Sequence, residues 1–220
     1  KELRAAIAER YARGWGAKYG VENAIATAGG KMALYEIAMA LLEPGDEVLV
    51  PAPYWVTFPE QVRLAGATPV TVPVPAEENF VLHADVVEAH LTPRTRALIL
   101  NTPNNPTGAV IPEAELRRIA AVCRRAGVAI IFDECYESFV YAPERHFCLA
   151  ALQAELGDLL LIAGSFSKTF AMTGHRLGYV LASAEIVSAL GKLQSHMTSN
   201  PTSFVQQGGS GVAQQPGELQ

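Results

Sequence analysis

The stretch RALILNTPNNPTG, residues 96–108, decides the fold class, because an apolar run of strand length leads directly into a polar loop. Two further stretches have the same pattern: VAIIFDECY at 128–136 and LLLIAGSFSK at 159–168. Continuous apolar strands of this kind are typical of a parallel sheet that is covered on both faces. The polar loops then meet beyond the carboxyl ends of the strands, where such sheets bind their ligands.

Helical patterns alternate with these strands along the chain. Residues 31–42 have an apolar pattern of helix length that stops at the turn Pro44-Gly45-Asp46. The segment EAELRRIAAVCRRA, residues 113–126, begins after Pro112 and ends before Gly127, as helices commonly do. Further strands are predicted at 47–51, 68–74 and 177–182, and further helices at 58–65 and 184–195. The alternation predicts an α/β fold with a mostly parallel sheet flanked by helices.

Composition and charge narrow the classes of function. The 220 residues carry a net charge of −5 and no concentrated basic cluster, which argues against a nucleic-acid partner. No apolar run approaches the length of a membrane span, and the first residues form a charged amphipathic helix rather than a secretion signal. The three cysteines are odd in number and lack metal-ligand spacing, so a reduced, cytoplasmic protein without a bound metal is expected.

The domain organisation follows from where the hydrophobic periodicity stops. Residues 1–207 carry the alternating pattern and are expected to form one large domain. The chain then continues as QQGGSGVAQQPGELQ, in which GGSG is typical of a flexible linker. Residues 208–220 are therefore predicted to be a flexible tail or linker.

Lys168 lies in the polar loop SFSKTFAMTGHR, residues 165–176. A lone lysine is most often an exposed residue at a helix start, but the neighbours of Lys168 favour another role. Ser165 and Arg176 supply a hydroxyl and a guanidinium, a pair suited to a phosphate dianion. Burial among cations would lower the lysine pKa from about 10.4, so that the amine could form a Schiff base with an aldehyde.

Asp133 ends a very apolar strand, VAIIF. It could simply cap the next turn. The functional alternative is a carboxylate that keeps a heteroaromatic ring nitrogen protonated, which makes the ring an electron sink. Tyr136 could then direct its phenol to the 3-oxygen of that ring, where Asn105 could also donate. By itself, an asparagine in the loop NNPTG is also good turn chemistry.

Two more segments could contact the same ligand. Gly29-Gly30-Lys31 opens a helix, so its backbone N–H groups could approach an anion, with Lys31 contributing through its backbone rather than its ammonium. Gly-Gly before a helix is more often only a turn. Trp55 follows a strand end in Pro-Tyr-Trp and could stack on a flat ring, although a core tryptophan is the alternative.

The motifs GGK, PYW, NNPTG, DECY and SFSKTFAMTGHRLGY together resemble the class I and II aminotransferases of fold type I, in their order and at similar separations. The resemblance covers nearly all of 1–207 and implies the large domain of that pyridoxal-phosphate-dependent transferase fold. It implies pyridoxal 5′-phosphate as cofactor, a homodimer when complete, and transfer of an amino group between an amino acid and a 2-oxo acid. The wording AMTGHRLGY is similar to the bacterial aspartate/aromatic subgroup, which hints at a dicarboxylic or aromatic amino donor paired with 2-oxoglutarate.

The resemblance also implies a role for each residue of the site. Lys168 would form the internal aldimine and move a proton between the substrate's alpha carbon and the cofactor's C4′. The remaining cofactor-binding residues would be Asp133 at the pyridine nitrogen, Tyr136 and Asn105 at the 3-oxygen, Trp55 stacked on the ring, and Ser165, Arg176 and the Gly30-Lys31 backbone at the phosphate. Members of the family are longer at both ends. The resemblance therefore implies an intact cofactor site beside an incomplete substrate site.

Three other functions are alternatives to amino transfer. The same scaffold supports other reactions, such as C–S lyase or cyclase chemistry, because a fold does not determine the reaction. A non-catalytic pyridoxal-phosphate-binding module is an alternative from a different class, although no helix-turn-helix segment accompanies the pattern. A nicotinamide-dependent dehydrogenase lacks support, because no G-x-G-x-x-G follows the first strand.

Overall fold

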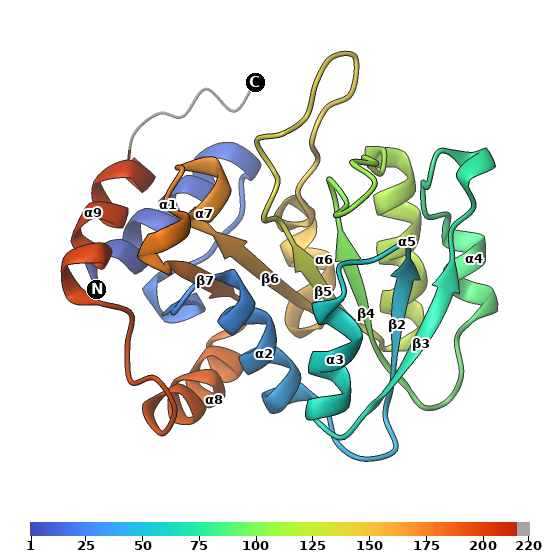
Figure 1. Cartoon of the computed structure of the whole chain (residues 1–220), viewed down its shortest axis with the longest axis horizontal. Helices are drawn as coiled ribbons and strands as arrows, with labels where there is room; N and C mark the ends of the chain where they lie inside the picture. The colour runs from blue at the N-terminus through green and yellow to red at the C-terminus, as the bar shows by residue number, and fades with distance from the viewer. Residues whose placement is uncertain (215–220) are drawn as a thin grey trace.

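The computed structural model describes residues 1–214, which form one seven-stranded sheet with helices on both faces (Figure 1). The strand order is β1-β7-β6-β5-β4-β2-β3. The strands are β1 Ala24–Thr27, β2 Glu47–Ala52, β3 Thr68–Pro73, β4 Thr95–Asn101, β5 Ala129–Asp133, β6 Leu160–Ser165 and β7 Gly178–Leu181. Strands β2, β3, β4, β5 and β6 run parallel to one another, whereas β7 is antiparallel to both of its neighbours, β6 and β1. The predicted α/β class with a mostly parallel sheet is confirmed.

The helices cover the two faces of the sheet in separate groups. Their bounds are α1 Glu2–Trp15, α2 Gly30–Leu41, α3 Thr57–Leu64, α4 Ala84–Ala89, α5 Glu113–Ala126, α6 Gln153–Leu156, α7 Phe166–Thr169, α8 Ala184–Ser195 and α9 Ser203–Gln214. Alternate residues of β4 enter different cores: Leu98 belongs to the core that also contains residues of α1, α4, α5 and α9, and Ile99 to the core that contains residues of α2, α3 and α8. This two-faced burial explains the continuous apolar runs in the sequence.

Among the strands of residues 1–214, β1 is the one that the sequence pattern did not predict. Its four residues pair with β7 from Ala24 opposite Leu181 to Thr27 opposite Gly178. A segment this short has no periodicity of its own, so only its pairing with β7 makes it a strand. The pairing places the following helix α2 at the edge where the polar loops gather.

The C-terminal segment differs from the predicted flexible tail. Residues 208–214 are the second half of helix α9, and 215–220 lie outside the described residues. Val205, Gly209 and Ala213 recur at intervals of four and are buried, which gives α9 a narrow face of small residues against α1. A side chain at Gly209 would collide with Leu177. Of the three glycines that are typical of a linker, Gly209 therefore permits close packing, whereas Gly208 and Gly211 face open space.

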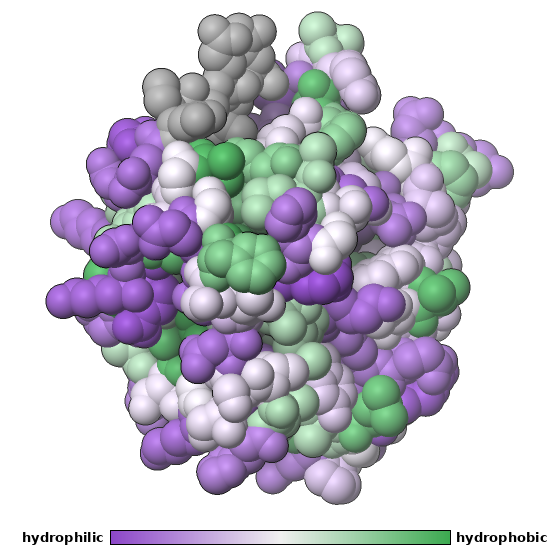
Figure 2. All heavy atoms as spheres, turned by 60° about the vertical axis from the view of Figure 1, so that its left-hand side comes forward, coloured by the Kyte–Doolittle hydropathy of each residue, from purple (hydrophilic) through white to green (hydrophobic). Residues whose placement is uncertain are grey.

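The surface of the side that carries the C-terminal helix is mixed in polarity. Figure 2 shows hydrophobic residues interspersed with hydrophilic ones over this face. Within residues 1–214, no helix is both long and apolar enough to cross a membrane.

Glu36 is an isolated buried acid in helix α2. Its side chain is 0% exposed, and neither carboxylate oxygen has a hydrogen-bond partner among the described residues. Burial raises the pKa of Glu36 to about 7. Because the folded pKa exceeds the unfolded value, the protein binds this proton more tightly when folded. The contribution of Glu36 to the free energy of unfolding is therefore fully present below about pH 4.5, and it is lost as the pH rises through about 7.

We predict that Glu36→Met stabilises the fold at pH 8 by about 1–3 kcal/mol, because it removes an unpaired buried charge and keeps the volume. Urea unfolding at pH 8 and pH 5 measures the free energy of unfolding. The gain should shrink markedly at pH 5, where Glu36 is protonated. Glu36→Gln serves as the neutral polar control. An equal gain for Glu36→Met at both pH values would show that ionisation of Glu36 does not cause the effect.

Candidate active site

A cavity of about 280 Å³ opens at the carboxyl edge of the sheet. All nine residues predicted from the sequence line it: Gly30, Lys31, Trp55, Asn105, Asp133, Tyr136, Ser165, Lys168 and Arg176. They come from α2, α7 and the ends of β5 and β6, together with loops that follow the strands. The tertiary structure therefore brings together residues that span almost 150 positions of sequence, whereas their individual roles remain predictions.

Five further lining residues were not predicted from the sequence: Leu34, Asn101, Cys135, Ser167 and Thr173. Asn101 had a usable signal, because it is the last residue of a buried strand. Its side chain donates to the backbone oxygen of Asp133 (3.1 Å) and accepts from the backbone N–H of Asn105 (2.8 Å). Asn101 thus holds two predicted site residues in register across neighbouring strands.

One end of the cavity gathers several hydrogen-bond donors and a positive charge. The N-terminus of α2 lies so close to β6 that a Cβ at Gly30 would be 3.0 Å from the Cβ of Ser165. Gly29 has a φ of +91°, and a side chain there would collide with the guanidinium of Arg176. Backbone N–H groups at a helix start, a hydroxyl and a guanidinium therefore converge on one point. This donor set is suited to a phosphate group.

Arg176 reaches this point through an uncommon backbone conformation. Its φ of +52° lies in the left-handed region, which a non-glycine residue rarely adopts. The guanidinium also donates to the backbone oxygen of Thr173 (3.0 Å), another lining residue. This local bond orients the side chain of Arg176 along the cavity wall.

Lys168 lies on α7, a single helical turn that begins after β6. Ser165 caps this turn, because its side-chain oxygen accepts a hydrogen bond from the backbone N–H of Ser167 (3.1 Å). The ammonium of Lys168 is 5.9 Å from the ring centre of Tyr136. The Lys168 side chain is exposed at the cavity wall, which differs from the buried amine that the sequence led us to expect. The reason is that α7 lies at the rim of the sheet, above the strand ends.

Asp133 forms the deep wall of the cavity. It is only 5% exposed, and one carboxylate oxygen accepts a hydrogen bond from the backbone N–H of Cys135 (2.9 Å). Burial raises the pKa of Asp133 to about 7, and nearby Glu134 raises it further, whereas the bond from Cys135 lowers it. Among the described residues, no cationic side chain contributes to lowering it. A cationic group in the cavity would therefore stabilise the carboxylate.

Tyr136 and Asn105 lie next to each other in the wall of the cavity. The side-chain nitrogen of Asn105 is 3.5 Å from the hydroxyl of Tyr136, so both groups can donate to one acceptor placed between them. Trp55 lines the cavity with its indole and packs edge-on against Phe58. The ammonium of Lys31 lies 4.9 Å from the ring centre of Trp55. The Lys31 side chain is thus engaged with the indole, which leaves its backbone N–H for the helix start.

Comparisons with known proteins agree with this geometry. The family model described as aminotransferase class I and II matches residues 1–219. A probable aspartate/prephenate aminotransferase of Aquifex aeolicus is 44% identical over 94% of this chain, and an aspartate aminotransferase of Geobacillus stearothermophilus is 41% identical over 93%. Each match covers 52% of the relative, so the chain spans about half the length of the curated relatives that it matches.

Solved structures are similar as well. The aromatic aminotransferase from Pyrococcus horikoshii superposes with a TM-score of 0.94 at 36% identity, over 98% of this chain and 58% of that one. The aspartate aminotransferase from Thermus thermophilus, solved with maleate, gives a TM-score of 0.89 at 38% identity, over 97% and 58% of the two chains.

We predict that Asp133→Asn stabilises the ligand-free protein at pH 8 by about 2 kcal/mol, because burying a neutral amide avoids the cost of removing a charged carboxylate from water. The folded pKa of Asp133 is raised, so its stabilising contribution is present at low pH and declines as the pH rises through about 7. Thermal unfolding at pH 5 and pH 8 measures the difference. If the variant were less stable than the parent at pH 8, the carboxylate would have a compensating partner that the geometry does not reveal.

Proposed function

We propose that this chain, which belongs to the class I and II aminotransferase family, forms the cofactor-binding part of a pyridoxal-phosphate-dependent transaminase. The observation that carries the proposal is one cavity lined by an anion site, a buried carboxylate and a lysine. We assign this part to residues 1–207, and helix α9 extends its core to Gln214. The chain covers about half of its relatives, so the activity is proposed for the whole protein.

The donor set fits the phosphate end of pyridoxal phosphate. The phosphate dianion would be held by Ser165, Arg176 and the backbone of Gly30 and Lys31. These four supply hydrogen-bond donors and a positive charge, and none of them carries a carboxylate. Any side chain at Gly29 or Gly30 would approach Arg176 or Ser165 too closely. The glycines therefore support close approach of an anion to the start of helix α2.

The other end of the cavity fits the pyridine ring. Asp133 would pair with the ring nitrogen, and the raised pKa of Asp133 supports this assignment because a cationic partner would offset the burial. Tyr136 and Asn105 would donate to the 3-oxygen. Trp55 would pack on the ring face. Bound pyridoxal phosphate supplies an electron-withdrawing ring that stabilises negative charge at the substrate's alpha carbon.

Lys168 would hold the cofactor covalently through its Nζ atom. After release by an incoming amino acid, the same amine could accept the proton from the substrate's alpha carbon and return it. Its position on the exposed side of the cavity supports this role, because the amine would face both the cofactor and the entering substrate.

The substrates that we propose are an amino acid and a 2-oxo acid. The curated relatives named above are aspartate and aspartate/prephenate aminotransferases, and a similar solved structure contains maleate, a dicarboxylate. We therefore favour a dicarboxylic or aromatic amino donor. We also propose a homodimer in the cytoplasm, which agrees with three free cysteines and with exposed hydrophobic side chains such as Val56 and Phe204.

The cofactor assignment predicts one labelled lysine. The protein incubated with pyridoxal phosphate should absorb visible light, and borohydride reduction followed by peptide mapping should place the label on Lys168. Lys168→Ala should abolish that label, because Lys31, the other lysine that lines the cavity, has its ammonium against the Trp55 ring. Lys192→Ala, on the exposed surface of α8, is the matched control and should leave labelling unchanged. A label on another lysine in the parent protein would overturn the site assignment.

The reaction assignment predicts amino transfer by the complete protein. Aspartate or an aromatic amino acid with 2-oxoglutarate should yield glutamate, measured by chromatography of both products. Arg176→Met should raise the concentration of pyridoxal phosphate needed for half-maximal activity by about tenfold or more, because a charge-assisted bidentate contact is lost. Release of ammonia or a thiol from the substrate, with no amino transfer for any pair, would point to lyase chemistry on the same scaffold.

A further inference from the structure

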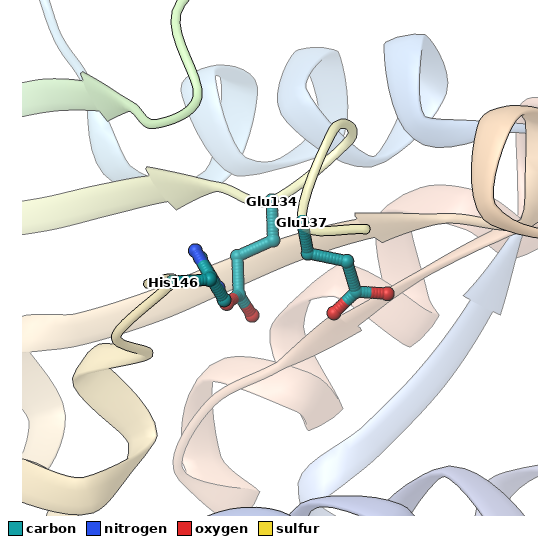
Figure 3. A group of neighbouring side chains, drawn as sticks. All are labelled: Glu134, Glu137 and His146. Atoms are coloured by element: carbon teal, nitrogen blue, oxygen red, sulfur yellow. The ribbon is translucent and has the colours of Figure 1, made fainter. Parts of the chain in front are cut away.

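A buried hydrogen-bond network lies behind the cavity, between helix α1 and the loop that follows β5. It consists of six residues: Arg10, Tyr11, Glu134, Glu137, His146 and Tyr179. Figure 3 shows three of them, Glu134, Glu137 and His146, gathered beside the ends of the strands. Possible metal-ligating atoms of these three lie within 4.8 Å of one another.

The carboxylates of this network already have partners. Glu134 accepts a hydrogen bond from the hydroxyl of Tyr11 (2.8 Å), and its other oxygen is 2.7 Å from a ring nitrogen of His146. Glu137 accepts from the guanidinium of Arg10 (2.8 Å). The carboxylate of Glu137 therefore already has a cationic partner, the guanidinium of Arg10. We therefore interpret the cluster as a closed network of side chains rather than a metal site.

The charges in the network balance one another. Burial opposes the charge on His146, yet its hydrogen bond to Glu134 raises the pKa of His146 above the usual value. Burial raises the pKa of Glu137 to about 7, whereas the guanidinium of Arg10 lowers it. The Arg10 and Glu137 side chains are 13% and 7% exposed, so little water screens their attraction. Such a pair is a rigid link, because loss of one partner leaves a buried charge.

Each carboxylate of the network is next in sequence to a residue of the cavity. Glu134 follows Asp133, and Glu137 follows Tyr136. The network therefore contacts the loop from behind while the neighbouring side chains face the cavity. Thr169 is also next in sequence to a residue of the cavity, Lys168, and its hydroxyl is 3.4 Å from the carboxylate of Glu137.

Arg10 joins this link to the helix that carries Lys168. Its guanidinium is 2.8 Å from Glu137 and lies 5.2 Å from the ring centre of Phe170, two residues after Lys168. Helix α7 has only four residues, and one isolated turn does not hold its own conformation. External contacts must therefore determine where α7 lies.

We propose that Arg10 and Glu137 are positioning residues that hold α7, and with it Lys168, in place relative to Tyr136. They act through Thr169 and Phe170 and do not line the cavity themselves. The inference rests on the proposed function, because it concerns how the cofactor-binding lysine is oriented. Its consequence is that helix α1, which is far from Lys168 in sequence, affects the reactivity of Lys168.

The test uses the complete protein and three variants. The double variant Arg10→Met/Glu137→Leu removes both charges together, so the fold is not left with one uncompensated buried charge. Thr169→Val removes the hydroxyl link and keeps the volume. Arg13→Met is the matched control, because Arg13 lies on the same helix and pairs with Glu9 on the exposed surface. Circular dichroism and thermal unfolding establish that each variant is folded.

Two readouts follow for the folded proteins: the rate of pyridoxal-phosphate attachment to Lys168, trapped by borohydride, and the midpoint pH of the visible absorption of the attached cofactor. We expect the double variant to attach cofactor about tenfold or more slowly and to have a shifted midpoint, because a misplaced amine loses its favourable geometry. Thr169→Val should change both readouts in the same direction by less. Arg13→Met should match the parent.

The outcomes separate the two proposals. A parent protein that attaches cofactor at Lys168, beside a double variant with the same rate and midpoint, overturns the positioning role alone. If the double variant does not fold, Thr169→Val decides, and parental values for both readouts overturn the inference. A parent protein that attaches no cofactor at Lys168 overturns the proposed function, and the positioning role falls with it.

Discussion

The close contact between the start of helix α2 and the ends of strands β6 and β7 is the constraint on which the site depends. A Cβ at Gly178 would collide with the backbone of Gly29 and Gly30, and one at Gly30 would press on Ser165. Glycine at these places lets helix and strands touch through their backbones. The helix N-terminus, with its unpaired N–H groups, is thereby brought to the same edge as Ser165 and Arg176. A larger residue would separate the donors that the anion site needs.

Buried ionisable groups are arranged differently on the two sides of the site. Asp133 faces the cavity, and within residues 1–214 its carboxylate accepts one hydrogen bond, from the backbone of Cys135, so its burial is only partly offset. Glu134, the next residue, faces away and is bound by Tyr11 and His146. The alternation of side chains after β5 thus separates a carboxylate available to a ligand from one committed to the fold. An under-compensated acid costs stability, and such a cost is common where a protein prepares a binding site.

Prediction from sequence succeeded where a residue's neighbours in the chain determine its environment. The buried strands β4, β5 and β6 are continuous apolar runs, and each ends in polar residues that line the cavity. Prediction failed for β1, which is a strand because β7 lies beside it, and for α9, in which Gly209 packs closely against the core. Glycine in sequence has two opposite meanings, flexibility and close approach, and only the neighbouring surface distinguishes them.

Local periodicity and strand-end polarity are properties of neighbouring residues, so they predict the α/β class, six of the seven strands, and the residue types that meet at one edge of the sheet. Which groups face each other depends on how the elements pack. The packing sets the exposure of Lys168 at the rim of the cavity. It also brings Asn105 to Tyr136 and joins Arg10 through Glu137 to α7, and both of these contacts are between residues far apart in sequence. Such contacts depend on how α1, α2 and the sheet pack in three dimensions, and no spacing along one chain encodes them separately.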